Sequence, residues 1–134
     1  ADAGVACKEY SAADTNEIST VCTTAIGECD VLYLPTDNTM ASSTETIKNI
    51  VVPAGIPVIA GEEGICRGCG VATLSSYEDL GRATGEMAYE ILVEGADIST
   101  MDVRFAPNVT KKYNASICAE LGITAPEGYE AIAE

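Results

Sequence analysis

The chain alternates between short apolar runs and longer segments in which apolar residues recur every three or four positions. The short runs predict strands, and the longer segments predict helices with one buried face. Strands are expected at residues 5–10, 31–34, 57–60, 71–74 and 101–106, and helices over residues 15–27, 38–53, 77–94 and 112–121. Residues 61–70 contain four glycines and are expected to form a connection with no more than one helical turn.

Strands and helices that alternate with short connections are typical of an α/β fold, in which helices cover a parallel sheet. The expected fold is an open, mostly parallel sheet of four to five strands with helices on both faces. No repeat or linker interrupts the pattern, so residues 1–134 are expected to form a single α/β lobe.

Polar side chains follow the second expected strand directly. Thr36, Asp37 and Asn38 come immediately after the apolar run that ends at Leu34 and Pro35. Open α/β sheets bind ligands at the carboxyl ends of their strands. These three residues can therefore face a small polar ligand, although Asp37 and Asn38 also suit the start of a helix.

Other strand ends are expected to open on the same edge of the sheet. The loops there carry Ser11, Asp14, Thr15, Asn16, Glu62 and Tyr77. Three of them have a structural alternative: Asp14 stands at an expected helix start, Glu62 suits a solvated loop, and Tyr77 suits a partly buried position.

The charge balance excludes some partners. The chain has 21 acidic and 7 basic residues, which gives a net charge of −14. Nucleic acids and anionic membrane surfaces attract clusters of Lys and Arg, so neither is an expected partner. No apolar run approaches the length of a membrane-spanning helix. The opening ADAGVACKEY has no Met and no leader, and we expect a processed or excised piece of a longer protein.

The residues for catalysis are sparse. The chain has no His, no nucleophile elbow and no glycine-rich phosphate loop with a basic residue. Asp14, Asp37, Glu62 and Glu63 leave a hydrolytic carboxylate pair open. Without His or a second CxxC motif, no metal or other cofactor is expected.

Cys66 and Cys69, two of the six cysteines, form a CxxC motif. A redox motif usually opens a long helix after the first strand, whereas this one lies late in the chain between two short strands. A local disulfide and redox activity stay open as alternatives. Ordinary thiols are the expectation.

Several segments together resemble one family. DVLYLPTDN, IPVIAGEEG, GVATLSSYEDLGRATGEMAYEILVEG and the closing LGITAP are similar to ABC-transporter substrate-binding proteins of the tryptophan- and tyrosine-binding type. The SAADTNEI stretch resembles the Ser- and Asn-rich segment of that family, with an altered spacing. The match runs from about Gly4 to Ala125, and PTDN and YEDLGRATGEMA are its specific segments.

The resemblance implies one lobe of a two-lobed, type I periplasmic-binding fold. Such proteins are periplasmic or lipid-anchored outside the cytoplasm, and they deliver a small ligand to a membrane permease without bond chemistry. Carried over by position, Thr36, Asp37 and Asn38 would line the ligand cleft. Ser11 and residues 14–16 would lie beside them, with Glu62 and Tyr77 at the rim. An amino acid is the expected ligand.

The sequence matches only the second half of such a protein. In the family the chain crosses to the first lobe after the strand at residues 71–74, so residues 77–134 are expected to pack partly on a lobe that this chain lacks. The apolar face of the helix at residues 77–94 then needs another partner. We expect it to fold back locally or to exchange with a second copy of the chain.

Overall fold

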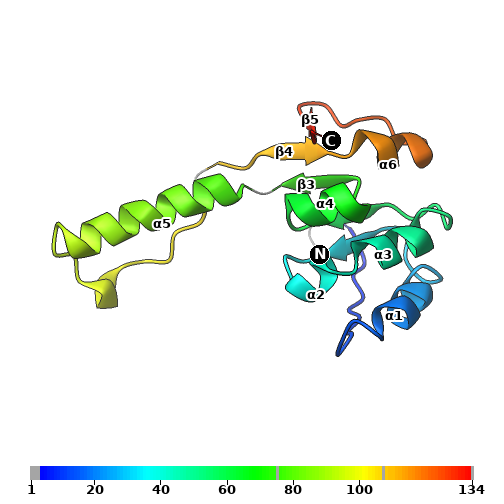
Figure 1. Ribbon diagram of the computed structural model, residues 1–134, viewed down its shortest axis with the longest axis horizontal. Helices are drawn as coiled ribbons and strands as arrows, with labels where there is room; N and C mark the ends of the chain where they lie inside the picture. The colour runs from blue at the N-terminus through cyan, green and yellow to red at the C-terminus, as the bar shows by residue number, and fades with distance from the viewer. Residues whose placement is uncertain (1–3, 75, 107, 134) are drawn as a thin grey trace.

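The computed structural model describes residues 4–74, 76–106 and 108–133 (Figure 1). The helices are α1 (Ile18–Ala25), α2 (Asn38–Ala41), α3 (Thr44–Val51), α4 (Glu63–Cys69), α5 (Tyr77–Leu92), the short 3-10 helix η1 (Ile98–Thr100) and α6 (Ala115–Glu120). The strands are β1 (Leu32–Leu34), β2 (Val58–Ala60), β3 (Ala72–Leu74), β4 (Lys111–Tyr113) and β5 (Glu130–Ala131).

The five strands form one sheet in the order β1-β2-β3-β4-β5. Only the β3–β4 pairing is antiparallel among these strands; β1–β2, β2–β3 and β4–β5 are parallel. The expected α/β class and the mostly parallel sheet are confirmed. Strands β1, β2 and β3 coincide with three of the expected apolar runs, because those runs are buried and bounded by Pro, Gly or polar residues.

Two apolar clusters hold helices against opposite sides of the sheet. The larger joins α1, α3 and α4 to β1 and β2, and its fully buried members include Ile47, Val51, Val58 and Ile65. The smaller joins α6 to β3 through Ile117 and Cys118. We name the sheet and these helices the body. Helices therefore lie on both faces, although α6 covers the second face only in part and leaves Tyr33 of β1 67% exposed.

Asn114 fastens α6 to the end of α4. Its amide group donates hydrogen bonds to the carbonyls of Cys66 and Arg67 at 3.1 and 3.0 Å. Its side-chain oxygen accepts from the Ile117 amide at 3.1 Å and caps α6. One side chain thus supplies a helix cap and two contacts between helices.

Replacing Asn114 with alanine is expected to lower the free energy of unfolding by about 2 kcal/mol, the sum of a lost cap and two lost hydrogen bonds. Urea denaturation followed by circular dichroism measures this change. Asn49, exposed on α3, is the matched control, and its replacement by alanine should cost nothing because alanine is the better helix former. Equal effects at the two positions would contradict the bridging role of Asn114.

Two expected strands are wrong. Residues 5–10 form no ladder, and side chains hold them instead: Lys8 and Tyr10 donate hydrogen bonds to Glu28, and Tyr10 packs on the larger cluster. Residues 101–106 are extended but unpaired, since they run beside α5 rather than beside a strand (Figure 1). Alternating side chains fit an extended chain, but a strand also needs a neighbour with which to share hydrogen bonds.

Three helix expectations also change. The helix expected over residues 38–53 is divided into α2 and α3 at Ser42 and Ser43. Residues 63–69 form two turns of helix, α4, where a glycine-rich connection was expected. The last helix begins at Ala115 rather than at Lys112, because Lys112 and Tyr113 pair with β3 and Asn114 caps the helix behind them. Among the described residues no helix has the length and apolar character to cross a bilayer.

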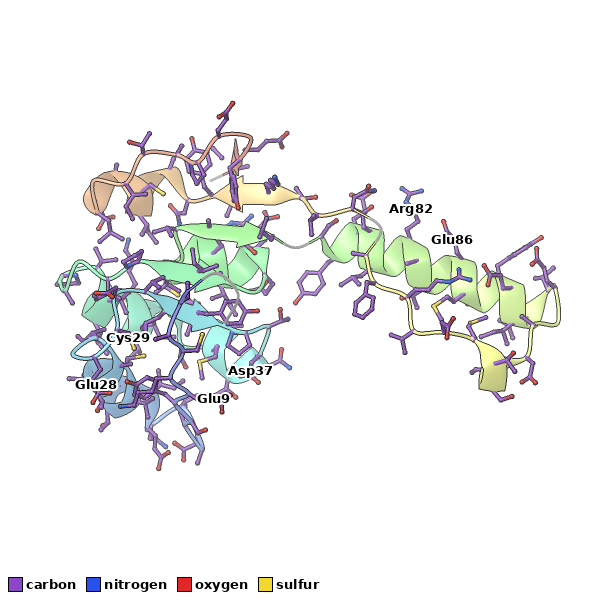
Figure 2. The ribbon with its side chains drawn as sticks, turned by 180° about the vertical axis from the view of Figure 1, so that it is seen from behind. Glu9, Glu28, Cys29, Asp37, Arg82 and Glu86 are labelled. Atoms are coloured by element: carbon purple, nitrogen blue, oxygen red, sulfur yellow. The ribbon has the colours of Figure 1, made fainter. Side chains whose placement is uncertain are left out.

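Helix α5 and its return segment, residues 77–106, project from the body as an arm (Figures 1 and 2). Ala83 is the one buried residue among those described in α5, and Tyr89, Leu92 and Phe105 are exposed. The return segment is tied to the helix by Arg104, whose guanidinium donates to both carboxylate oxygens of Glu90 at 2.8 and 2.6 Å. The first of the two expected alternatives was that this helix folds back locally. It is wrong, because the arm points away from the body (Figure 1). Exchange with a second copy stays a prediction.

Candidate functional site

Strands β1, β2 and β3 run in the same direction and end at the same edge of the sheet. Figure 1 shows that this edge faces the side from which the arm projects. The loops that follow the three strands lead into α2, α4 and α5, and each of these helices begins with a polar capping residue: Asp37, Glu62 and Ser76. We name these loops the strand-end edge.

The first two loops of the strand-end edge are joined directly. The Gly61 amide donates to the Leu34 carbonyl at 2.7 Å, and the Thr36 hydroxyl donates to the Gly61 carbonyl at 3.0 Å. A Cβ atom at Gly61 would lie 2.6 Å from the Thr36 backbone nitrogen, closer than carbon atoms approach in real structures. Glycine at this position therefore allows the two loops to touch.

Asp37 caps α2 from an exposed position. Its Oδ1 atom accepts hydrogen bonds from the amides of Thr39 and Met40 at 2.8 and 3.0 Å. Within the described part of the chain, both hydrogen bonds to this carboxylate end on Oδ1. Figure 2 shows Asp37 on the side of the body that faces the arm. Asn38, also exposed, is the first residue of the helix. The cap expected at Asp37 is confirmed.

Glu62 does not lie in a solvated loop, the structural alternative that the sequence suggested. It is buried, with 8% of its surface exposed, and it caps α4 by accepting from the Gly64 amide at 2.7 Å and from the Ile65 amide. Each carboxylate oxygen takes one of these bonds. The buried cap follows from α4 itself, because a helix that begins at Glu63 leaves its first amides in need of acceptors.

The segment before α1 is exposed and is organised by its own turn. Asp14 accepts from the amides of Asn16 and Glu17 at 2.8 and 3.3 Å, and Glu17 in return accepts from the Ala13 amide at 2.9 Å. Ser11 and Thr15 are exposed as well. No hydrogen bond between described residues joins this segment to Thr36, Asp37 or Asn38. The structure thus gives these residues accessible side chains, with no contact that groups them with the strand-end edge.

Tyr77 stands where the arm leaves the body. It is the first residue of α5 and is 57% exposed, and Ser76 before it accepts from the Asp79 amide at 3.2 Å. A cavity of about 410 Å³ lies at this junction. Its walls come from both sides of the junction: Glu63, Ser76, Tyr77, Glu78, Thr110, Lys112 and Glu130.

The CxxC motif is buried inside α4. Cys66 and Cys69 are both 0% exposed. The Cys66 thiol donates to the Gly70 carbonyl, and the Cys69 thiol donates to the Ile65 carbonyl. Burial raises the pKa of each thiol to about 12. A redox cysteine reacts as an exposed thiolate with a lowered pKa, whereas these two thiols are buried and have a raised pKa. Within the described residues no group of three or more Cys, Asp or Glu side chains is placed to hold a metal ion.

The sequence reasoning missed one ion-pair network beside this edge. Glu63, the first residue of α4, accepts from Arg67 at 3.0 Å and from Lys112 of β4 at 2.6 Å. Glu63 and Arg67 are four residues apart, the spacing of an ion pair on a helix, and that spacing was a readable sign of α4. The contact with Lys112 spans 49 residues and has no local signal.

Comparison with known proteins places these observations in a family. The model of the ABC transporter substrate binding protein family matches residues 1–134. The chain is 34% identical over 96 residues to the tyrosine-binding protein of Clostridioides difficile strain R20291, a match that covers 71% of this chain and 28% of that protein.

Solved structures agree with this assignment. An ABC domain in complex with L-Trp from Streptococcus pneumonia is 29% identical, with a TM-score of 0.81 over 98% of this chain and 46% of that one. A ligand-free, open substrate-binding protein with adhesive properties from Clostridium difficile is 35% identical, with a TM-score of 0.66 over 89% of this chain and 42% of that one.

The chain thus spans less than half of the length of these relatives. The superposition on the L-Trp complex extends over nearly the whole chain and so includes the arm. With a family match along its full length, the chain belongs to the ABC transporter substrate-binding protein family.

Proposed function

We propose that this chain is the ligand-contacting lobe of an extracytoplasmic solute-binding protein. The full-length protein would capture a small polar solute, an amino acid, between two lobes and deliver it to an ABC permease, with no bond chemistry. The observation that carries the proposal is the strand-end edge, where Thr36, Asp37 and Asn38 are accessible on a fold shared with binding proteins for tyrosine and L-Trp.

The chemistry of this edge suits an amino acid. A carboxylate such as Asp37 pairs with an α-ammonium group, and a charge-assisted hydrogen bond of this kind is stronger than a neutral one. The Asn38 amide and the hydroxyls of Ser11 and Thr15 can contact the carboxylate or a polar side chain. Asn16, Asp14, Glu62 and Tyr77 complete the proposed set, of which Glu62 would act mainly through the loop that it braces.

The proposal includes a second lobe for a physical reason. The strand-end edge is open on the side of the arm, and a site formed by one wall holds a small ligand weakly, because most of the ligand surface stays in water. In a full-length protein, the part that corresponds to the unmatched residues of the relatives would supply the opposing wall. The same part would carry any lipid anchor that attaches the protein to the outer side of the membrane.

Asp37→Asn is expected to weaken amino acid binding by about tenfold or more, because it removes the charge from a charge-assisted hydrogen bond. Asparagine keeps the cap of α2, so the free energy of unfolding should hardly change. Isothermal titration of the full-length protein with L-Tyr, L-Trp and a panel of other amino acids measures the affinity.

Asp97→Asn is the matched control, since Asp97 caps η1 at the far end of the arm by accepting from the Ser99 amide at 2.9 Å. It should leave the affinity unchanged. Binding that is equally tight in the wild type and in Asp37→Asn would remove Asp37 from the site. A wild-type protein that binds no amino acid or other small solute would overturn the proposed function.

A further inference from the structure

The arm is attached to the body through one pair of neighbouring strands. The chain leaves the body after β3 and returns at β4, and these strands pair antiparallel with Leu74 opposite Lys111 and Thr73 opposite Lys112. We name the paired ends of these two strands, Leu74 with Lys111 and Lys112, the neck. Any change in the direction of the arm must therefore bend the backbone next to these strand ends.

One ion pair connects this neck to the rest of the body. The Nζ atom of Lys112 lies 2.6 Å from Oε2 of Glu63, and the two side chains are only 29% and 31% exposed. Because close to a third of each side chain is exposed, added salt can still screen the pair in part. Arg67 binds the other oxygen of Glu63 at 3.0 Å, but it lies on α4 itself and does not reach the neck.

Glu63 is also close in the chain to the strand-end edge. It follows Glu62, the buried cap of α4, and stands two residues after Gly61, whose carbonyl accepts from Thr36. The loop at Thr36 is thus connected through Gly61 to the start of α4, where Glu63 contacts Lys112. The cavity of about 410 Å³ beside Glu63 and Lys112 gives these side chains room to move.

We propose that Glu63 and Lys112 are a positioning pair that sets the direction of the arm and couples it to the strand-end edge. The pair holds β4 against α4 when the arm has the direction seen in Figure 1. Loss of the pair frees the neck without changing a ligand contact. The effect on the arm stands by itself, and the effect on ligand affinity rests on the proposed function.

The arm direction is tested by pulsed electron–electron distance measurement on this chain. Spin labels attached through unnatural amino acids at Thr46 and Glu94, both exposed, report the separation of α3 from the end of α5. Lys112→Gln and Glu63→Gln should each widen the distribution of distances, and the double variant should widen it no further. Arg67→Gln is the matched control and should leave it unchanged.

Salt supplies a second test that needs no variant. Raising the ionic strength should widen the distribution in the wild type, because screening weakens the pair, and should have little effect on Lys112→Gln. A Lys112→Gln distribution that overlaps the wild type would overturn the proposal. A distribution that widens equally in Arg67→Gln would also overturn it, because the effect would then come from the charge of α4.

In the full-length protein, Lys112→Gln is expected to change the affinity for the amino acid by about two- to fivefold, the size of one partly exposed ion pair. Arg67→Gln should not. A wild type without amino acid binding would count against the proposed function alone, since the distances in this chain are measured without ligand. A wild type that binds, with an affinity unaltered by Lys112→Gln, would overturn the coupling.

Discussion

Replacing Gly61 with alanine is expected to lower the free energy of unfolding by about 3 kcal/mol, near the upper end of the usual cost of overpacking. The added Cβ atom would lie 2.6 Å from the Thr36 nitrogen and 2.9 Å from the Pro35 carbonyl carbon. Both are backbone atoms, so no side chain can rotate away. The loop must instead shift, which weakens the hydrogen bonds that Gly61 makes with Leu34 and Thr36.

Gly81→Ala is the matched control for this change. Gly81 lies inside α5, in its second turn, and a Cβ atom there would meet nothing within 4 Å. Alanine is the better helix former, so this variant should raise the stability of α5 by about 0.5–1 kcal/mol and leave the unfolding of the body unchanged. Urea denaturation followed by circular dichroism compares the two. A Gly61→Ala protein as stable as the wild type would show that the two loops of the strand-end edge are not in close contact.

The stability of the fold is expected to fall steeply in alkaline solution, and Cys66 and Cys69 are the main reason. Burial raises the pKa of each thiol to about 12, whereas thiols in an unfolded chain titrate near about 8.5–9. Above that range the unfolded chain loses protons that the folded chain retains. The free energy of unfolding should therefore fall by about 1.4 kcal/mol per pH unit for each thiol.

This loss begins near the unfolded pKa and continues until the pH reaches the folded value of about 12. Urea midpoints measured under reducing conditions from about pH 8 to about pH 10.5 cover most of this window. The double variant Cys66→Ala with Cys69→Ala should show a flatter dependence, after a small cost for lost packing. Midpoints that stay level in the wild type would mean that the thiols ionise inside the fold, and would favour the redox alternative.

Local signals were enough to predict much of the fold. The apolar runs that became β1, β2 and β3 are bounded by Pro, Gly and polar residues, and helix α5 begins at the expected Tyr77 because Ser76 caps it. The cap at Asp37 was equally readable. In each case the deciding interaction lies within a few residues in the chain.

The remaining elements depend on contacts between distant residues. Glycines at positions 64 and 68 suggest a loop, yet both lie inside α4. The close packing of α4 on α3 accounts for the glycine at position 68, because a Cβ atom there would be 2.4 Å from Cβ of Thr44. Lys112 is in a strand because β3 lies beside it. Residues 5–10 have a strand pattern and no strand partner. Helix propensity and side-chain alternation do not contain this information.

The candidate site was predictable to the same extent. The sequence identifies Thr36, Asp37 and Asn38 because they follow a strand, and the structure adds that Gly61 joins their loop to the next one. The sequence alone could not show that Glu62 is buried or that Glu63 contacts Lys112, since both follow from the packing of α4.

The thin attachment of the arm has a consequence for cooperativity. Helix α5 buries one of its described side chains, and the hydrogen bonds from Arg104 to Glu90 lie within the arm. The body therefore gains little when the arm is ordered and loses little when it melts. The arm and the body are then separate folding units, and amide hydrogens in α5 should exchange with solvent through openings that leave β1, β2 and β3 intact.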